Sequence, residues 1–165
     1  MASKAPSFKG LKPATKASSY AKRNNKRRDT KHEILLRKEL SRIGLRFRKN
    51  VETLPGKPDI VFTRAKLAVF CDGDFWHGRD WRSLKKNLNK GTNAEYWLAK
   101  IAANIKRDKR NTALLKKAGW SVIRVWETDI KENPLAIAHL IKKHATHVNT
   151  NKIQRTGLKR IICRL

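Results

Sequence analysis

Two short apolar runs joined by a tight connection constrain the fold of this chain more than any other feature. Residues 60–62 and 67–70 have the length and composition of buried strands. Residues 63–65 leave room only for a tight turn between them, so we expect an antiparallel pair. The Pro-Gly-Lys-Pro sequence at 55–58 predicts another turn ahead of the first strand.

Ionisable side chains stand at the ends of this strand pair, where packing alone would not place them. Asp59 begins the first strand, and Asp72, Asp74 and His77 follow the second. A cluster of this kind at the end of a buried sheet is typical of a binding or catalytic site.

The residue types in this cluster suit metal-assisted hydrolysis. Carboxylates on neighbouring strand ends can hold Mg²⁺, which prefers oxygen ligands and accepts a phosphate oxygen. One or two such ions would activate water and stabilise the charge that builds on a phosphodiester during attack. A nearby histidine can take the proton from that water, because imidazole exchanges protons near neutral pH. These groups together predict a phosphodiesterase acting on DNA or RNA.

The charge balance indicates a polyanionic partner. The 165 residues include 40 Lys and Arg against 13 Asp and Glu, which gives a formal net charge of +27. This excess goes beyond what solubility requires, and nucleic acid is the simplest partner that explains it. A ribosomal or RNA-packaging protein would carry a similar charge, but it would not need an acidic cluster at a strand end.

The two cysteines, Cys71 and Cys163, lie far apart and form neither a disulfide framework nor a metal-knuckle spacing. We therefore expect a reducing compartment. No apolar stretch reaches the roughly 18–20 residues of a membrane span, and the basic N-terminus lacks the apolar segment of a secretory signal. Residues 1–28 contain no acidic side chain, and an organellar transit peptide is the minority interpretation of them.

A helix is predicted to begin at Thr30, because Thr30 and Glu33 have the spacing of a capping box. Gly44 is expected to end this helix. Its apolar positions near one face are Ile34, Leu36, Leu40 and Ile43. Glu33 has two interpretations, a structural cap and a carboxylate that points at the strands. The spacing alone favours the cap.

Residues 45–51 alternate like a strand with one wet face, and residues 75–91 are predicted to be an irregular basic loop. Phe75 and Trp76 begin this loop. They either fill the core or stack on or between bases, and the residue pattern leaves both open.

A long helix is predicted over residues 94–118, capped by Thr92 or Asn93, and a strand over 120–126 follows it. Its expected buried stripe consists of Trp97, Ile101, Ile105 and Leu115. Asn104, Arg107 and Asp108 share one face and form either a surface network or a phosphate site. A final helix is predicted over 133–144, and Ile161–Ile162 suggest a short added strand. The order of elements predicts a single mixed α/β domain with a central sheet.

Four blocks of sequence, at 55–62, 69–78, 96–108 and 115–127, resemble the very-short-patch repair (Vsr) mismatch endonucleases in the same order. The resemblance covers about residues 20–145. It implies a restriction-endonuclease-like fold, in which a central mixed β-sheet is flanked by helices in three layers. It also implies an enzyme that nicks one strand of double-stranded DNA beside a mismatch with the help of Mg²⁺.

The resemblance also assigns roles to residues. It implies that Asp59 binds the metal, that Cys71 offers its backbone carbonyl to the metal, and that His77 activates the water. Glu33 matches a helical glutamate that assists through metal-bound water, so the resemblance favours a functional role for it. It likewise favours Phe75 and Trp76 as a wedge that enters the duplex. The basic residues expected to contact DNA are Lys57, Arg79, Arg82, Lys100, Arg107 and Arg110.

Two departures from the family pattern affect the expectations. Asp72 stands where other members carry a second histidine, which shifts its expected role towards metal binding. The family's structural zinc site uses cysteine and histidine, whereas the matching positions here are Asp74, Arg79, Trp81 and Thr128. We therefore expect no structural zinc and a possible pairing of Asp74 with Arg79 or Arg82.

The expected organisation is a disordered basic arm over residues 1–28, an endonuclease domain over 29–147 and a basic C-terminal extension over 148–165. We expect a cytoplasmic, nucleoid-associated protein of a bacterium or phage, with an organelle as the alternative. The sequence does not fix the oligomeric state, although a monomer is favoured. Two other functions stay open, namely a homing or restriction-type enzyme that breaks both strands and a catalytically silent DNA-binding protein of the same fold.

Overall fold

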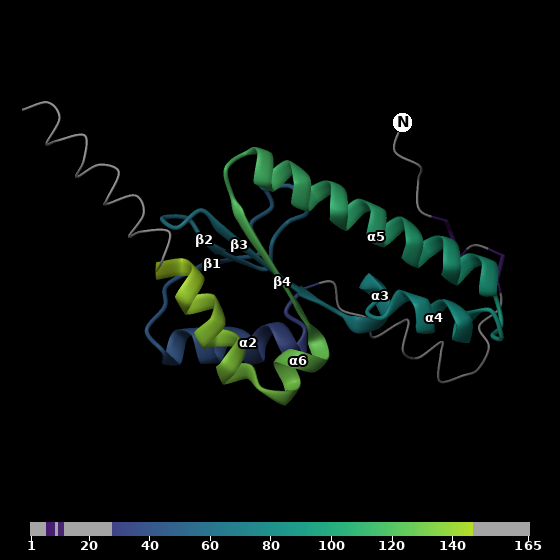
Figure 1. Cartoon of the computed structure of the whole chain (residues 1–165), viewed down its shortest axis with the longest axis horizontal. Helices are drawn as coiled ribbons and strands as arrows, with labels where there is room; N and C mark the ends of the chain where they lie inside the picture. The colour runs from purple at the N-terminus through teal and green to yellow at the C-terminus, as the bar shows by residue number, and fades with distance from the viewer. Residues whose placement is uncertain (1–5, 9, 12–27, 147–165) are drawn as a thin grey trace, which may run out of the picture.

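The computed structural model describes residues 6–8, 10–11 and 28–146. The helices and strands follow one another along the chain as shown in Figure 1, and residues 134–146 form a final helix. The elements are α2 (Lys31–Arg42), β1 (Arg48–Lys49), β2 (Ile60–Phe62), β3 (Leu67–Asp72), α3 (Asp74–His77), α4 (Trp81–Leu88), α5 (Ala94–Lys117), β4 (Ser121–Trp126) and α6 (Glu127–Glu132).

The four strands form one mixed sheet in the order β1-β2-β3-β4. β2 and β3 pair antiparallel, with Ile60 opposite Val69, which confirms the expected hairpin. β3 and β4 pair parallel, with Phe70 opposite Arg124. Parallel strands require a long crossover, and here α3, α4 and α5 supply it. The carboxyl ends of β3 and β4 therefore lie together at one edge of the sheet.

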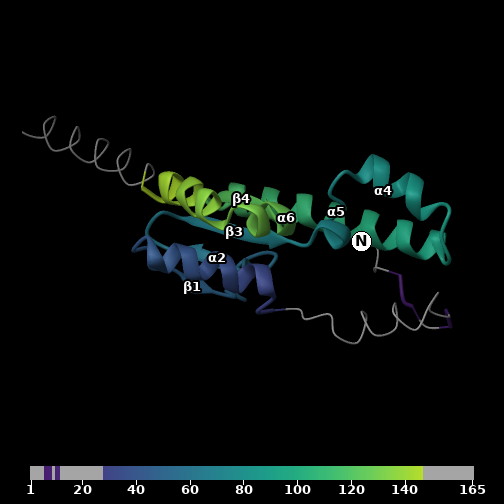
Figure 2. The same cartoon turned by 90° about the horizontal axis from the view of Figure 1, so that it is seen from below.

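Helices cover both faces of the sheet and produce three layers. Side chains that alternate along β3 divide between the two faces, as the pleat requires. Leu67 and Val69 pack against α2, α6 and the final helix, and Figure 2 looks onto this face. Ala68 and Phe70 form a second cluster with Leu115 of α5. This confirms the predicted three-layer α/β arrangement with a central mixed sheet.

The capping box that was predicted at the start of α2 is present. Thr30 is the N-cap residue, and its side chain accepts a hydrogen bond from the backbone N–H of Glu33. Leu36 and Leu40 are fully buried in the core, as expected. Ile34 was placed near the same face, but 41% of it is exposed, because it lies about 200° around the helix from Leu36.

Two local predictions were wrong. The expected loop at 75–91 contains α3 and α4, since its basic residues are good helix formers and Asp80 caps α4 by accepting from the N–H of Ser83. The strand expected over 45–51 is reduced to β1, because β1 pairs with only two residues of the short β2. Glu127 directly follows β4 and begins α6.

Within the ranges that the structure describes, no helix is both long and apolar enough to cross a membrane. Most of the predicted N-terminal arm, the C-terminal extension and the strand proposed at Ile161–Ile162 lie outside the described residues.

Candidate active site

Asp59 and Cys71 are joined by a hydrogen bond at the end of the β2–β3 pair. The backbone N–H of Cys71 donates to Asp59 Oδ2 over 2.7 Å. The pKa of Asp59 is raised from its ordinary 3.8 to about 7, mainly by burial and also by the charges of Glu33 and Asp72, against the lowering effect of the Cys71 hydrogen bond. An aspartate in this setting carries poorly compensated negative charge at neutral pH, so it is a natural place for a cation.

The backbone carbonyl of Cys71 lies on the same peptide segment and faces His32. His32 Nε2 is 3.3 Å from this oxygen and 3.1 Å from Thr30 Oγ1. Only 7% of His32 is exposed, and its Nδ1 is 3.8 Å from Glu127 Oε1. His32 therefore fixes the orientation of a carbonyl that was expected to face a metal. Its sequence context does not single it out, because a histidine in the first turn of a helix has many ordinary roles.

Asp72 is held by Arg124, an arginine whose sequence context likewise does not single it out. Arg124 Nε lies 2.6 Å from Asp72 Oδ2, and Arg124 Nη2 lies 2.6 Å from Asp72 Oδ1. The guanidinium also lies 4.6 Å from the ring centre of Phe70, its partner across the two strands. Burial lowers the pKa of Arg124, but its hydrogen bond to Asp72 and the charges of Asp72 and Asp108 outweigh this and leave the pKa above its ordinary value.

His77 is bound to Asp108 on the long helix α5. His77 Nδ1 is 2.6 Å from Asp108 Oδ2. Burial acts to raise the pKa of Asp108, yet the hydrogen bond from His77 and the charges of Arg124 and Arg107 leave it below the ordinary 3.8. Asp108 is therefore ionised and can only accept, so Nδ1 carries the proton and Nε2 of the neutral ring keeps its lone pair.

Close packing against α5 sets the position of α3, which carries His77. Asn104 Nδ2 donates to the backbone carbonyl of Trp76 over 2.9 Å. Gly78 ends the helix with φ of +69°, and a Cβ there would come within 2.7 Å of Ile105 Cδ1. Only glycine lets the chain turn this close to α5. Asn104 and Asp108 therefore serve the site, whereas the sequence left open a surface network or a phosphate site.

Glu33 acts as the cap that its spacing predicts. Its Oε1 accepts from Thr30 Oγ1 over 2.7 Å, and its Oε2 accepts from the N–H of Asp29 over 2.9 Å. Only 3% of Glu33 is exposed, and its charge acts on Asp59. The cap therefore places a carboxylate within electrostatic range of the metal-binding candidate.

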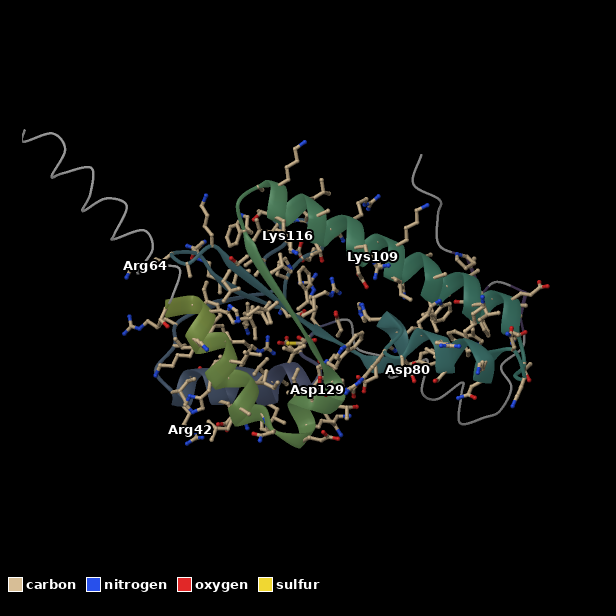
Figure 3. The ribbon with its side chains drawn as sticks, viewed as in Figure 1. Arg42, Arg64, Asp80, Lys109, Lys116 and Asp129 are labelled. Carbon is tan, nitrogen blue, oxygen red and sulfur yellow. The ribbon has the colours of Figure 1, made fainter. Side chains whose placement is uncertain are left out.

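A polar network connects α3 with α6 at positions that the resemblance matches to the family's zinc ligands. The Thr128 hydroxyl donates to Asp74, and Arg79 Nη1 lies 3.4 Å from Asp74 Oδ1. Arg79 Nη2 also lies 2.6 Å from Asp129, which Figure 3 labels on α6. The expected pairing of Asp74 with Arg79 is present, so Arg79 has carboxylate partners within the fold.

Phe75 and Trp76 belong to an aromatic cluster on α3 and α5. Trp97 is its centre, with ring centres 5.5 Å from Phe75, 5.8 Å from Trp76 and 4.9 Å from Tyr96. The Phe8 ring lies 4.9 Å from the Tyr96 ring. Phe75 is 37% exposed, whereas Trp76 is half-buried. The cluster thus anchors one aromatic ring and presents another to solvent.

The other basic candidates lie mainly on the outside of the fold. Arg82 on α4 and Arg107 and Arg110 on α5 are exposed, and Lys100 is half-buried. Lys57 is exposed in the turn before β2, where its Nζ is 3.6 Å from Glu52. Figure 3 shows Lys109 and Lys116 along the same helix α5, far from Arg42 on α2.

The structure thus gathers the predicted chemistry-bearing residues at one edge of the sheet. Asp59, Cys71, Asp72 and His77 come together there, with Glu33 close by. The additional members are His32, Asp108 and Arg124. The sequence does hint at Asp108, since it shares a polar helix face with Asn104. The hint at Arg124 is weaker, namely a charged residue within an otherwise largely apolar strand.

A layered α/β fold with this acidic cluster at the sheet edge places the protein among the restriction-endonuclease-like nucleases. Residues 11–83 match the family described as DNA mismatch endonuclease Vsr. The type II nicking enzyme V.NmeDIP of Neisseria meningitidis is 45% identical over 73% of this chain and 80% of that protein. V.HpaIIP of Haemophilus parainfluenzae, also a type II nicking enzyme, is 41% identical over 74% and 85%, respectively. DNA mismatch endonuclease Vsr of Escherichia coli is 38% identical over 63% and 65%. The chain belongs to the Vsr family of endonucleases.

Proposed function

We propose that this protein is a Mg²⁺-dependent endonuclease that nicks one strand of duplex DNA at a mismatch. The observation that carries the proposal is the meeting of a half-buried, under-compensated Asp59 with an oriented His77 at one edge of the sheet. Relatives named as nicking enzymes and as a mismatch endonuclease support the strand-nicking activity.

The residues present fit a hydrated Mg²⁺ ion. Within the described part of the chain, no three His, Cys, Asp or Glu side chains form a complete metal cage. Mg²⁺ does not require one, because it keeps several waters and uses one or two protein oxygens. Asp59 and the Cys71 carbonyl would supply those oxygens. When bound, the ion would polarise the phosphate and lower the energy of the developing charge.

His77 would act as the general base. Asp108 holds the proton on Nδ1, so the Nε2 lone pair can accept a proton from the attacking water. The water oxygen forms a bond to phosphorus, and the bond from phosphorus to the leaving oxygen breaks. The leaving oxygen takes up a proton, so the reaction yields one phosphomonoester end and one hydroxyl end.

Duplex binding would use the basic side chains and the aromatic cluster. Arg82, Arg107 and Arg110 are exposed and would contact phosphates without reading sequence. Phe75 is the exposed ring beside His77 and would wedge between base pairs. A base pair that is already mismatched unstacks at lower cost, which would favour a mismatch as the cutting site.

The substrate is tested with end-labelled duplexes that carry each mismatch in turn, beside a fully paired duplex of the same sequence. We expect Mg²⁺-dependent cleavage of one strand at a mismatch and at most slow cleavage of the paired control. Equal cleavage of paired and mismatched duplexes would contradict the mismatch proposal, and cleavage of both strands would contradict nicking.

A further inference from the structure

Asp72 is the predicted metal ligand whose surroundings fit that role least. It ends β3, directly after Cys71, and only 3% of it is exposed. Each of its two oxygens receives a hydrogen bond of 2.6 Å from Arg124. Such a bidentate carboxylate–guanidinium pair is among the stronger charged contacts in proteins.

Metal binding by Asp72 would have to break this pair. Displacement of the guanidinium would leave a largely buried arginine without its main partner, and loss of one partner from a buried ion pair is strongly unfavourable. Arg124 Nη1 is already buried without a hydrogen-bond partner. Arg124 therefore has little freedom to release Asp72 and find another acceptor.

The pair also closes a ring of contacts around His77. Asp72 Oδ1 lies 3.4 Å from His77 Nδ1, and Arg124 Nη2 lies 3.4 Å from Asp108 Oδ2. Asp108 Oδ2 is the atom that accepts the proton of His77. One guanidinium group thus connects the two carboxylates that flank a single ring nitrogen.

We propose that Arg124 is a positioning residue of the nuclease site, and that Asp72 acts through Arg124 and His77 and is not a metal ligand. Arg124 holds both carboxylates at Nδ1 and thereby directs Nε2 towards the position of the attacking water. Because this rests on the proposed nuclease function, metal binding and catalysis must be measured separately.

The test compares Asp72→Asn, Arg124→Gln, Arg124→Lys and Asp59→Asn with the wild-type protein. Catalysis is measured as the single-turnover rate of nicking at saturating DNA, together with the half-saturating concentrations of DNA and Mg²⁺. Metal binding without DNA is measured by electron paramagnetic resonance of added Mn²⁺. Arg42→Gln, which removes an exposed ion pair with Glu39 on α2, is the matched control.

We expect Arg124→Gln and Asp72→Asn to slow nicking by about tenfold or more, while both half-saturating concentrations stay within about twofold of wild type. Arg124→Lys should recover part of the rate, since an ammonium group can still pair with Asp72. Mn²⁺ binding should persist in Asp72→Asn, be lost in Asp59→Asn and be unaffected by Arg42→Gln.

A tenfold loss of Mn²⁺ or Mg²⁺ affinity in Asp72→Asn would overturn the proposal, as would a wild-type nicking rate in folded Arg124→Gln. If Arg124→Gln does not fold, the double variant Asp72→Asn/Arg124→Gln removes both charges together, and the same rate loss is expected from it. If the wild-type protein nicks no DNA, the proposed function fails. Mn²⁺ binding by Asp72→Asn then still decides whether Asp72 is a ligand.

Discussion

His77 Nδ1 lies 2.6 Å from Asp108 Oδ2, so the short helix α3 is connected to the middle of α5 by one strong hydrogen bond. The two residues are 31 positions apart in sequence. The bond decides which ring nitrogen carries the proton, and it leaves Nε2 as the basic atom. In this respect Asp108 would play the part of the orienting carboxylate of a catalytic triad.

Asp108→Asn should therefore slow nicking far more than it weakens DNA binding. The asparagine amide can donate to Nδ1, which would move the ring proton to Nε2 and remove the basic atom. We expect a rate loss of about 10²- to 10⁴-fold. Single-turnover kinetics measures the rate, and ¹⁵N NMR of His77 at pH 8 reports the tautomer. Asp80→Asn, at the cap of α4, is the control and should change neither.

Asp59→Asn should stabilise the metal-free protein at pH 8. The pKa of Asp59 is about 7 in the folded protein, against an ordinary 3.8, so the folded state prefers the neutral acid. The stability that this group contributes therefore falls as pH rises from about 3.8 to about 7. Asparagine keeps an oxygen for the Cys71 N–H and removes the charge. We expect a gain of about 2 to 4 kcal/mol in the free energy of unfolding.

The gain from Asp59→Asn should shrink as pH falls from 7 towards 4, because the wild-type carboxyl is then protonated in the folded state. Urea unfolding in EDTA at several pH values measures it. A destabilised variant at pH 8, or a gain independent of pH, would show that Asp59 carries no buried charge.

Phe75→Ala should weaken the recognition of mismatched DNA at little cost to the fold. Phe75 is 37% exposed, whereas Trp76 is half-buried against Trp97. Loss of one ring that stacks on a base is expected to cost about 1–3 kcal/mol of binding. Fluorescence anisotropy with a mismatched duplex measures it. The control is Leu114→Ala, which removes an exposed apolar side chain on a different helix, α5, and should leave DNA affinity unchanged.

Thr128→Val should destabilise the protein by about 1–2 kcal/mol, because it leaves Asp74 without the hydroxyl donor that links α6 to α3. Thr146→Val, whose hydroxyl is exposed and donates to carbonyls of its own helix, should have little effect. Thermal unfolding measures both variants. If the contacts among Asp74, Arg79 and Thr128 stabilise this region in place of a structural metal, strong chelators should leave the wild-type unfolding temperature unchanged. A lower unfolding temperature in the presence of chelator would contradict this.

Much of the fold follows from local sequence signals. The strand pair at 60–70, the cap at Thr30 and the long helix before Gly119 each have a short-range cause, so the residues themselves predict them. The helix α4 was missed because its charges resemble those of a solvated loop, and the free energy that favours helix there comes partly from α5.

The site was predictable only in part for a related reason. Asp59 and His77 stand next to an apolar strand pair in the sequence, so they can be predicted as site residues from the sequence alone. Arg124 and Asp108 reach the same site from β4 and α5, and only the parallel pairing of β3 with β4 brings them there. The partners of Asp72 therefore could not be inferred from the neighbouring sequence.

The most direct test measures nicking of supercoiled plasmid or mismatched duplex by the wild-type protein and by Asp59→Asn, each with Mg²⁺ and with EDTA. It asks whether the residues at this edge of the sheet break the phosphodiester bond. The wild-type protein should produce nicked DNA with Mg²⁺ and none with EDTA, and Asp59→Asn should bind the same DNA without cutting it. Cutting that persists in EDTA, or in the Asp59→Asn variant at the wild-type rate, would show that the phosphodiester is broken elsewhere or by other means.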